Sequence, residues 1–169
     1  MSNGRAQLTK SDIEKIEAEI DERKYEIRPR LIADLQAARA QGDLSENFEY
    51  YAAKKAKNEN EGRIRYLERM LKTAEIVSDS SAEDEVGINN TVTLYFEEDD
   101  EEQVYKVVTS IRGNSLENRI STESPIGRAV MGHKAGDRVS VRVSDDYSYY
   151  VVIRSIDKTT TGDDAIKKF

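Results

Sequence analysis

Three acidic side chains stand three residues apart in a short segment that begins with a glycine. Residues 42–54 read GDLSENFEYYAAK, which places Asp43, Glu46 and Glu49 at this spacing. Mg²⁺ prefers oxygen ligands and is often held by only one or two protein carboxylates together with groups from a partner. Two acids on an exposed turn cannot complete a metal site, but they can complete one that another protein supplies. A second metal ion in such a site can activate water for phosphodiester hydrolysis.

The same residues also fit the start of a helix. Asp43 followed three residues later by Glu46 resembles a capping box, in which the first side chain caps the helix and the second reaches back. Ser45 offers a competing N-cap. The residue types alone leave both interpretations open. Asparagine caps helices about as well as aspartate but is a poor ligand for Mg²⁺, so Asp43→Asn separates the two.

The composition excludes several other kinds of chemistry. The chain has 169 residues, no cysteine and one histidine, His133. Disulfides, thiolate metal sites and a multi-histidine site within the chain are therefore excluded, and His133 is expected to be structural or solvent-exposed. Phosphate-binding glycine loops, nucleophile elbows and metalloprotease helices are absent from the sequence. The chain is not expected to be an enzyme by itself.

Charge and hydropathy limit the possible environment and partners of the protein. The sequence has no apolar run long enough to cross a bilayer, and its N-terminus lacks the apolar core of a signal peptide. We therefore expect a cytoplasmic protein with no membrane partner. The first 76 residues carry 15 basic and 15 acidic side chains, so the rest of the chain carries the whole net charge of −7. This asymmetry supports a domain boundary near residue 78.

Two apolar stripes at helical spacing predict an antiparallel helical hairpin. The first covers residues 9–41 and the second about 45–74, with Gly42 ending the first helix. Stripes this narrow suit a two-stranded seam, and the short connection makes the helices antiparallel. The expected seam residues are Ile13, Ile16, Ile20, Ile27, Leu31, Leu35 and Ala38, then Ala53, Ala56, Asn60, Ile64, Leu67, Leu71 and Ala74.

Single residues are expected to modify this hairpin. Thr9 or Ser11 can cap the first helix, and Pro29 should kink or interrupt it. Asn60 places a polar group on the seam, which either loosens the hairpin or fixes its register. Small residues near the turn make the hairpin slim at that end, which suits insertion into a narrow space.

The second half alternates apolar and polar residues and predicts a small β-rich domain. The six acids EEDDEE are expected to form the exposed turn of a hairpin, and Ser124-Pro125 opens a short helix. The predicted strands are TVTLYF (91–96), QVYKVVTSI (103–111), RVSVRV (138–143) and YSYYVVIRSI (147–156).

Several motifs together resemble the Gre family of bacterial transcript-cleavage factors, GreA type. The resemblance covers nearly the whole chain. The motifs are Arg28-Pro29, GDLSEN (42–47), EYYAAK (49–54), EGRI (61–64), SPIGRAVMG (124–132) and Gly136-Asp137.

The resemblance implies an α+β fold: an N-terminal antiparallel α-helical coiled-coil hairpin followed by a small FKBP-like β-sheet domain with one short helix. Residues 1–77 would form the hairpin with its acidic tip at 42–47, and 78–85 a linker. Residues 86–158 would form the FKBP-like, polymerase-docking domain, and 159–169 a flexible tail. Similarity to FKBP does not imply prolyl isomerase activity.

The resemblance also implies a function. The β-rich domain would dock at the rim of the secondary channel of bacterial RNA polymerase, and the hairpin would enter the channel as a monomer. Asp43 and Glu46 would hold a Mg²⁺ ion shared with the polymerase and not bound stably by the factor alone, while Ser45 would orient them or the RNA. The polymerase would then cleave the 3′ end of its backtracked nascent RNA. Glu49 would be an acid of the helix surface.

Two other functions are considered. One is a regulator that enters the same channel without stimulating cleavage, and the other is a coiled-coil interaction module without chemistry. Lys54, Lys55 and Lys57 are either a solvated surface or contacts for RNA phosphates. Phe48 and Tyr50 either pack the turn, which we expect, or contact the partner.

Overall fold

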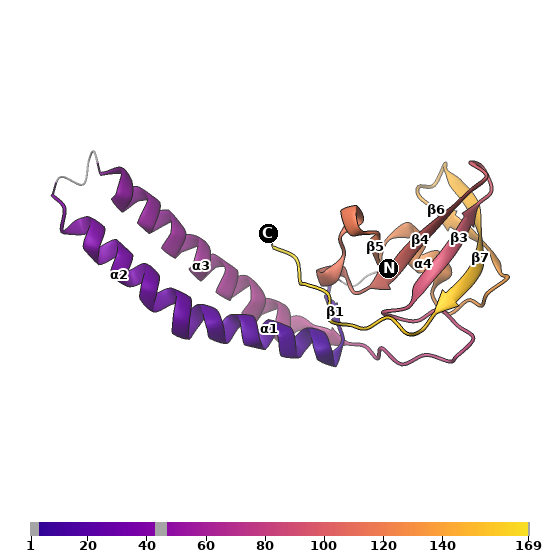
Figure 1. Ribbon diagram of the computed structural model, residues 1–169, viewed down its shortest axis with the longest axis horizontal. Helices are drawn as coiled ribbons and strands as arrows, with labels where there is room; N and C mark the ends of the chain where they lie inside the picture. The colour runs from indigo at the N-terminus through magenta and orange to yellow at the C-terminus, as the bar shows by residue number, and fades with distance from the viewer. Residues whose placement is uncertain (1–3, 43–46, 169) are drawn as a thin grey trace. The chain divides into compact units, whose positions relative to one another are not determined.

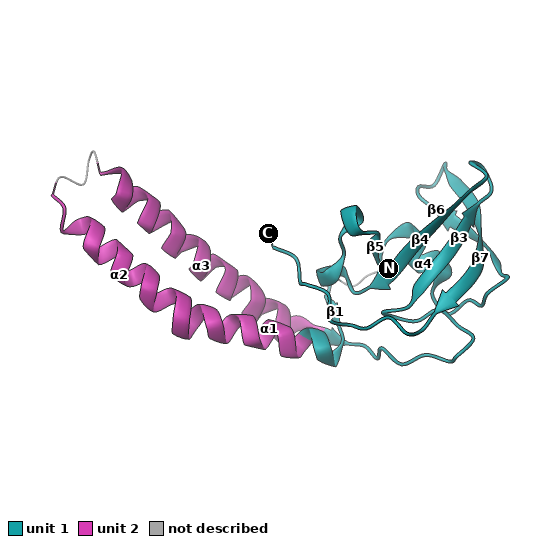
Figure 2. Cartoon of the chain, in the orientation of Figure 1, with its two compact units in different colours: residues 1–12, 75–168 teal, residues 13–74, 169 magenta. Residues whose placement is uncertain are grey.

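The computed structural model describes residues 4–42 and 47–168. They form two compact units (Figure 2), one within residues 13–74 and one made of residues 4–12 with 75–168. A helical hairpin and a β-rich unit are the α+β architecture that the sequence predicts. Within the described residues, no helix is both long and apolar enough to span a membrane.

The hairpin has two helical arms that lie side by side along α2 and α3 (Figure 1). The first arm passes from α-helix through one π-helical turn and back to α-helix, whereas the second arm is one continuous helix. The segments are α1 (Lys10–Glu22), the π-helical turn η1 (Arg23–Ile27), α2 (Arg28–Arg39) and α3 (Phe48–Thr73).

The predicted seam is the inward face of the hairpin, and all of its positions are buried or half-buried. Ala38 is 4% exposed, and Ala53 and Ala56 are half-buried, so small side chains line the end near the connection. Small side chains allow two helices to approach closely, and the slim end expected from them stays a prediction. The fully buried members are Ile16, Ile20, Leu35, Ala38, Asn60, Ile64 and Leu67.

The interruption predicted at Pro29 takes the form of the π-helical turn. Proline has no N–H to donate to the carbonyl of Tyr25, and its ring crowds that carbonyl. In the turn before it, the N–H of Arg28 bonds to the carbonyl of Arg23, five residues back. Pro29 itself lies in the first turn of α2, where proline is tolerated. The arm therefore continues past the proline without ending.

Polar residues inside the hairpin hold the two arms opposite each other. Asn60 donates its Nδ2 to the carbonyl of Arg23 at 3.3 Å and accepts from the Nη1 of that arginine at 3.0 Å. Arg63, which is 4% exposed, donates to both carboxylate oxygens of Glu19 at 2.8 and 3.3 Å. A slip of one residue would break both pairs. Of the two predicted roles of Asn60, it therefore fixes the register.

The second unit is built on a five-stranded mixed sheet in the order β5-β4-β3-β7-β6. The β4–β5 pair is parallel and the other neighbours are antiparallel, while β1 and β2 form a separate parallel pair. The four predicted strands are present, and the three-residue strand β5 was too short to predict. The strands are β1 (Gln7–Leu8), β2 (Glu75–Ile76), β3 (Thr91–Phe96), β4 (Glu101–Val108), β5 (Arg119–Ser121), β6 (Arg138–Arg142) and β7 (Ser148–Asp157).

Alternate residues of the strands form the apolar core of this unit. The short helix α4 (Pro125–Val130) covers it and begins as predicted, because the Ser124 Oγ accepts a hydrogen bond from the Gly127 N–H at 3.1 Å. The core residues are Val86, Val92, Leu94, Val107, Val130, Val139, Val141, Val151 and Ile153.

The predicted acidic turn between β3 and β4 is shorter than expected, because residues 97–100 form the turn and Glu101 and Glu102 begin β4. Nearby side chains pair with three of its acids, and one of these pairs is an ion pair of Arg138 with Glu97, whose Nε and Oε2 atoms are 2.7 Å apart. The hydroxyl of Tyr95 donates to Asp100 at 2.6 Å, and that of Tyr147 donates to Glu98 at 3.0 Å. The turn is thus a solvated, partly neutralised surface.

The first turn of α1 is closed by a capping box. The Asp12 N–H donates to Thr9 Oγ1 at 3.2 Å, and the Thr9 N–H donates to Asp12 Oδ2 at 2.9 Å. The two side chains thereby satisfy each other's backbone donors. Of the two predicted caps, Thr9 rather than Ser11 is the one used.

Asp12 is also the partner of a buried arginine. Arg112 is 2% exposed and donates its Nε to Asp12, while the Thr109 hydroxyl donates to Asp12 Oδ2 at 2.8 Å. The Nη1 of Arg112 donates to the carbonyls of Gly162 and Asp164. A buried charge needs such partners because desolvation otherwise disfavours it. Arg112 therefore connects the C-terminal segment to the first turn of α1 within this unit.

The two units differ from the predicted division of the chain. The prediction assigns residues 1–77 to the hairpin, but residues 4–12 belong to the sheet unit, since β1 pairs with β2 and Asp12 pairs with Arg112. The prediction also assigns 159–169 to a flexible tail. The described part, 159–168, instead makes hydrogen bonds to Arg112 and an ion pair with Lys106. The two partners in each of these contacts are far apart in the sequence, so no local sequence pattern predicts the contacts.

We predict that Glu19→Gln weakens the hairpin at neutral pH and has less effect in acid. Burial alone raises the pKa of Glu19, but the hydrogen bonds and charges of Arg63 and Arg23 outweigh it and hold the pKa below its usual 4.5. A depressed pKa contributes stability that is complete above pH 4.5 and is lost as pH falls through the folded-state value. At pH 7 the substitution should cost about 2 kcal/mol, because Arg63 loses its ionic partner.

Thermal unfolding followed by circular dichroism at pH 7 and at pH 3 measures this effect. Glu17→Gln, at an exposed position of the same helix, is the matched control and should leave stability nearly unchanged. An equal cost of Glu19→Gln at both pH values would contradict the assignment.

We also predict that removing residues 159–169 destabilises the sheet unit. The truncation takes away two carbonyl acceptors of Arg112 and the partner of Lys106. The expected loss is about 2 kcal/mol in the free energy of unfolding, measured by urea denaturation. Asp164→Ala, which keeps both carbonyls, should cost less. A truncated chain with the midpoint and slope of the full chain would contradict this role.

Candidate functional site

The connection between α2 and α3 begins at a well-defined helix end. α2 ends at Arg39, and Ala40 is its C-cap residue. Gly42 follows with φ of 111°, a conformation that side chains disfavour, so the glycine allows the chain to leave the helix. This agrees with the predicted role of Gly42 at the end of the first helix.

The connection ends at Asn47, which caps α3. Its backbone is extended (φ −89°, ψ 93°), and its Oδ1 accepts a hydrogen bond from the Tyr50 N–H at 3.0 Å. Asparagine is among the best N-cap residues, because its short side chain reaches an unpaired N–H of the first turn. The interpretation of Asp43 or Ser45 as the cap of this helix is therefore wrong. The helix begins at Phe48 rather than near Ser45.

The three predicted site residues, Asp43, Ser45 and Glu46, lie outside the described residues. Their predicted roles stay predictions. The position of the cap still bears on them, because α3 obtains its N-cap from Asn47. The start of the helix therefore does not require either carboxylate, and the metal-ligand interpretation no longer competes with a capping interpretation.

The side chains that follow the connection divide into packed and exposed ones. Tyr50 is half-buried, and the guanidinium of Arg39 lies 5.8 Å from its ring centroid. The packing expected for Tyr50 is therefore found. Phe48 is 86% exposed, so the packing expected for it is wrong within the described chain. The first turn of α3 thus presents an aromatic side chain to solvent.

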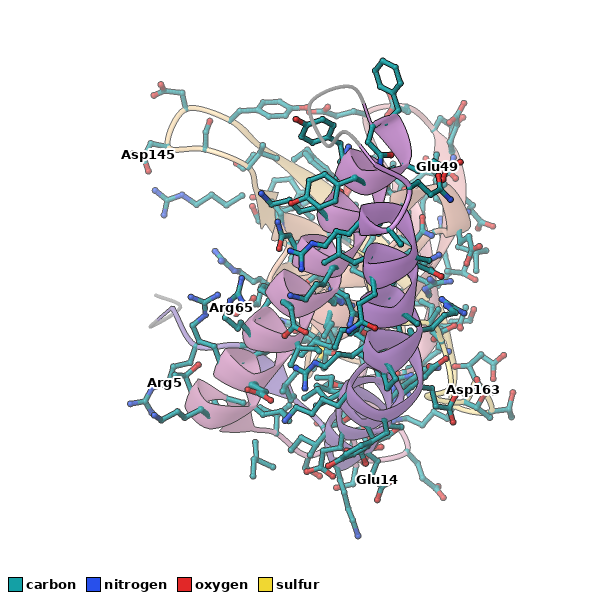
Figure 3. The ribbon with its side chains drawn as sticks, turned by 90° about the vertical axis from the view of Figure 1, so that its left-hand side faces the viewer. Arg5, Glu14, Glu49, Arg65, Asp145 and Asp163 are labelled. Atoms are coloured by element: carbon teal, nitrogen blue, oxygen red, sulfur yellow. The ribbon has the colours of Figure 1, made fainter. Side chains whose placement is uncertain are left out.

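The charged residues of α3 near the connection are mostly exposed. Glu49 lies at the surface of the first turn (Figure 3), as predicted. Lys54 and Lys55 are exposed and Lys57 is half-buried. Lys55 is 4.0 Å from Glu59, an exposed pair of the kind that contributes little stability. The lysines are therefore available to a negatively charged partner.

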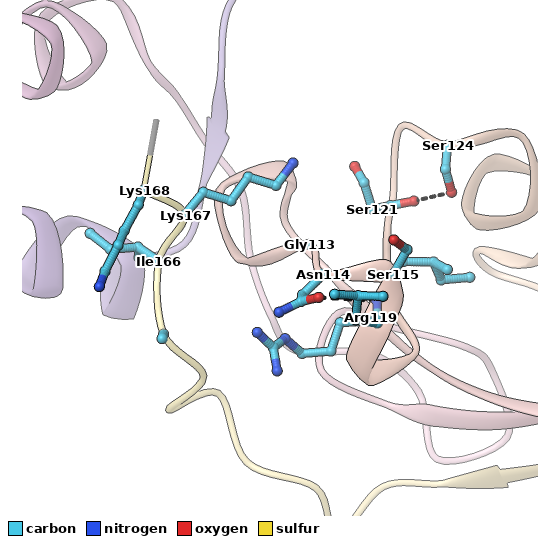
Figure 4. A pocket seen from close by; sticks show the side chains of 12 residues that line it. Gly113, Asn114, Ser115, Arg119, Ser121, Ser124, Ile166, Lys167 and Lys168 are labelled. Atoms are coloured by element: carbon cyan, nitrogen blue, oxygen red, sulfur yellow. Dashed lines mark hydrogen bonds between the residues drawn. The ribbon is translucent and has the colours of Figure 1, made fainter.

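No group of three or more possible metal ligands is found within residues 4–42 and 47–168. A groove of about 710 Å³ opens in the sheet unit between the turn around η3 (Ser115–Glu117) and the C-terminal segment (Figure 4). Arg119, Lys167 and Lys168 contribute cationic side chains to it, and Ser124 donates a hydrogen bond to the carbonyl of Ser121 at 2.6 Å. Its cationic lining differs from the acidic site that the sequence predicts.

The exposed histidine also agrees with its prediction. His133 is about half exposed, and its Nδ1 lies 3.3 Å from Asp137. It follows the short helix α4 at the surface and is far in sequence from the acidic tip.

Comparisons with known proteins place both units in one family. The family model described as "Transcription elongation factor, N-terminal" matches residues 6–76, and that described as "Transcription elongation factor, GreA/GreB, C-term" matches residues 81–158. The transcription elongation factor GreA of Streptococcus pneumoniae strain G54 is 42% identical over 153 residues, covering 90% of this chain and 95% of the relative. The chain belongs to the GreA/GreB family of transcription elongation factors.

Another curated relative and two solved structures are also similar to this chain. GreA of Streptococcus sanguinis strain SK36 is also 42% identical, with the same coverage. Among solved structures, the transcription factor Gfh1 aligns at 27% identity with a TM-score of 0.45, covering 90% of this chain and 97% of that one. GreA/GreB of Nitrosomonas europaea aligns at 19% identity with a TM-score of 0.39, covering 90% and 99%.

Reasoning from the sequence missed three residues that organise this family member. Asn47 stands within the GDLSEN motif, and its place three residues before the Tyr50 N–H was a signal of capping. In the sequence, Arg63 lies beside the apolar stripe and not on it, which favours its interpretation as an exposed surface charge. Arg112 pairs with Asp12, 100 residues away, and no local signal predicts that contact.

Proposed function

We propose that this protein enters the secondary channel of bacterial RNA polymerase and stimulates Mg²⁺-dependent cleavage of backtracked nascent RNA. It acts as an accessory factor, because two carboxylates complete a site that the polymerase supplies. The sheet unit docks on the polymerase and the hairpin carries Asp43 and Glu46 to the reacting RNA 3′ end. The proposal takes the factor to act as a single copy.

The observation that carries this proposal is the cap of α3. Because Asn47 supplies the cap, Asp43 and Glu46 are not needed to start the helix. Their oxygens match the ligands that Mg²⁺ prefers, and two carboxylates are a usual protein contribution to a Mg²⁺ site shared with phosphate groups. A bound Mg²⁺ ion would make water acidic enough to attack the phosphodiester. Asp43 and Glu46 would hold the ion, and Ser45 would orient them or the RNA.

The shape of the hairpin supports the same function. Its arm α3 has 26 residues and therefore extends about 39 Å. Alanines line the seam toward the connection, and their small side chains favour a slim end. Exposed Lys54 and Lys55 lie near the start of α3, where they can neutralise RNA phosphates. A slim arm with acids at its end and cations behind them fits a narrow channel that contains RNA.

The deciding experiment follows RNA shortening in a halted, backtracked elongation complex with Mg²⁺. The unaltered protein should accelerate shortening, and Asp43→Asn or Glu46→Gln should each reduce the acceleration at least about 10-fold, because a direct ligand matters no less than its supporting groups. Glu49→Gln is the matched control, since Glu49 is an exposed acid of the neighbouring turn. It should retain the full acceleration.

The affinity for polymerase, measured by competition with a labelled copy of the protein, should be unchanged in all three variants. Binding without acceleration by the unaltered protein would show the regulator without cleavage instead. Full acceleration by Asp43→Asn would reject the site assignment.

A further inference from the structure

An arginine of the sheet unit contacts both an aromatic ring and an acid of the turn after β3. The guanidinium of Arg138 lies 3.7 Å from the ring centroid of Tyr150, and its Nε donates to Glu97 Oε2 at 2.7 Å. The face of an aromatic ring attracts a cation, and a carboxylate accepts hydrogen bonds from the N–H groups of a guanidinium. The ring and the acid thus attract the same positive charge.

A second arginine of the sheet has the same two kinds of partner. The guanidinium of Arg154 lies 4.6 Å from the ring centroid of Tyr95, and its Nε lies 3.8 Å from Glu102 Oε1. Its acid, like that of the first arginine, belongs to the six consecutive acids at residues 97–102. The sheet and these acids therefore twice form a set of one ring, one acid and one arginine.

A third group of rings and acids from the same part of the sheet unit borders a small cavity. The cavity has a volume of about 150 Å³ and is lined by three aromatic side chains and two acidic ones, Phe96, Tyr147, Tyr149, Glu98 and Asp99. Small-molecule sites usually measure about 300–1,000 Å³, so this cavity suits the head group of a single side chain. Its lining repeats the rings and acids that hold the two arginines.

The rings of the cavity are held in place by their neighbours. Phe96 stacks on Tyr149 with ring centroids 5.9 Å apart, and it meets Tyr105 edge to face at 6.3 Å. These three rings also pack against the apolar core of the unit. The ring centroid of Tyr147 lies 5.9 Å from that of Tyr149. Walls that are already packed lose little conformational freedom when a ligand binds.

The two acids give the cavity a negative potential. The Tyr147 hydroxyl donates to Glu98 Oε2 at 3.0 Å, and because a hydroxyl is neutral, this hydrogen bond does not neutralise the carboxylate. The pKa of Tyr147 is raised by this hydrogen bond, then by burial and by the charges of Glu98 and Asp99. Burial raises the pKa of Tyr149, and the charge of Glu98 adds to the effect. Surroundings that oppose a negative phenolate favour a positive ligand.

We propose that this cavity binds an arginine side chain of a protein partner, whose guanidinium stacks on the rings and pairs with Glu98 and Asp99. Arginine suits the cavity better than lysine, because a planar and weakly hydrated guanidinium both stacks on rings and presents several N–H groups to carboxylates. Residues 77–169 carry the whole net charge of −7, which attracts a basic partner surface. The inference goes beyond the proposed function and does not depend on RNA cleavage.

The test titrates the full chain with a blocked tripeptide that has arginine between two glycines. NMR follows the ring signals of Phe96, Tyr147 and Tyr149. The same tripeptide with citrulline is the matched probe, because citrulline has nearly the shape of arginine and no charge. The arginine peptide should shift the three ring signals along a saturating curve, and the citrulline peptide should bind at least about 10-fold more weakly. Equal binding of the two peptides would overturn the proposal.

Two further probes test the identity of the occupant. A tripeptide with lysine should bind more weakly than the arginine peptide, because an ammonium does not stack on a ring as a guanidinium does. Free L-arginine should bind no more tightly than the peptide, because the cavity receives only the head group. Tighter binding of the lysine peptide would show a preference for an ammonium, and tighter binding of free arginine would show a small-molecule site. Either result would overturn the proposal.

Glu98→Gln and Tyr147→Leu test the assigned residues. Each should weaken binding of the arginine peptide at least about 10-fold, because one removes a charge and the other removes a ring. Glu101→Gln, at an exposed acid nearby, and Tyr150→Leu, at the ring that contacts Arg138, are the matched controls and should keep the affinity. Glu98 is exposed, so Glu98→Gln leaves the packing intact even if Tyr147→Leu disturbs it. Unchanged affinity in either test variant would overturn the site as proposed.

Discussion

The register between the two arms of the hairpin is the constraint on which the candidate site depends. A seam one or two residues wide buries too little apolar surface to select one alignment, because a slip exchanges one aliphatic contact for another. Polar pairs between the two arms select one alignment. Asn60 recognises the backbone and side chain of Arg23, Arg63 recognises Glu19, and Arg28 binds both oxygens of Glu61 at 2.7 and 2.9 Å. Each pair forms at one alignment, so together they determine which residues meet at the end of the hairpin.

Ala38 and Asn47 meet at that end, and their contact joins the last turn of α2 to the start of α3. In this alignment the Nδ2 of Asn47 reaches the Ala38 carbonyl while its Oδ1 caps α3. One neutral side chain thus ends one helix and begins the next. The cap of α3 therefore does not require the acids between the two helices, which is a condition of the role proposed for them. The π-helical turn before Pro29 lets the first arm reach this point without a break.

The sheet unit depends on a different interaction, the buried pair of Arg112 and Asp12. The guanidinium donates to Asp12 and to two carbonyls of the C-terminal segment, so three stretches of chain meet at one charge. Asp12 closes the capping box with Thr9 as well. Breaking such a pair costs more than the pair contributes, because the remaining charge would stay buried without a partner. The unit therefore includes both the start of α1 and residues beyond the matched family domain.

The sequence by itself determined the elements whose signals are local. Apolar spacing located both arms and every seam position, alternation located four strands, and Ser124-Pro125 located α4, because periodicity and capping act within a few residues. The GDLSEN motif predicts Asp43 and Glu46 as the acids of the site, and this stays a prediction. The tertiary structure decided what depends on distant partners. Asn47 rather than Asp43 caps α3, Asn60 and Arg63 set the register, and Arg112 draws residues 4–12 and 159–168 into the sheet unit. Polar side chains become buried and paired only when segments far apart in the chain come together. The cost of removing a polar group from water is offset only where a hydrogen-bonding partner is present.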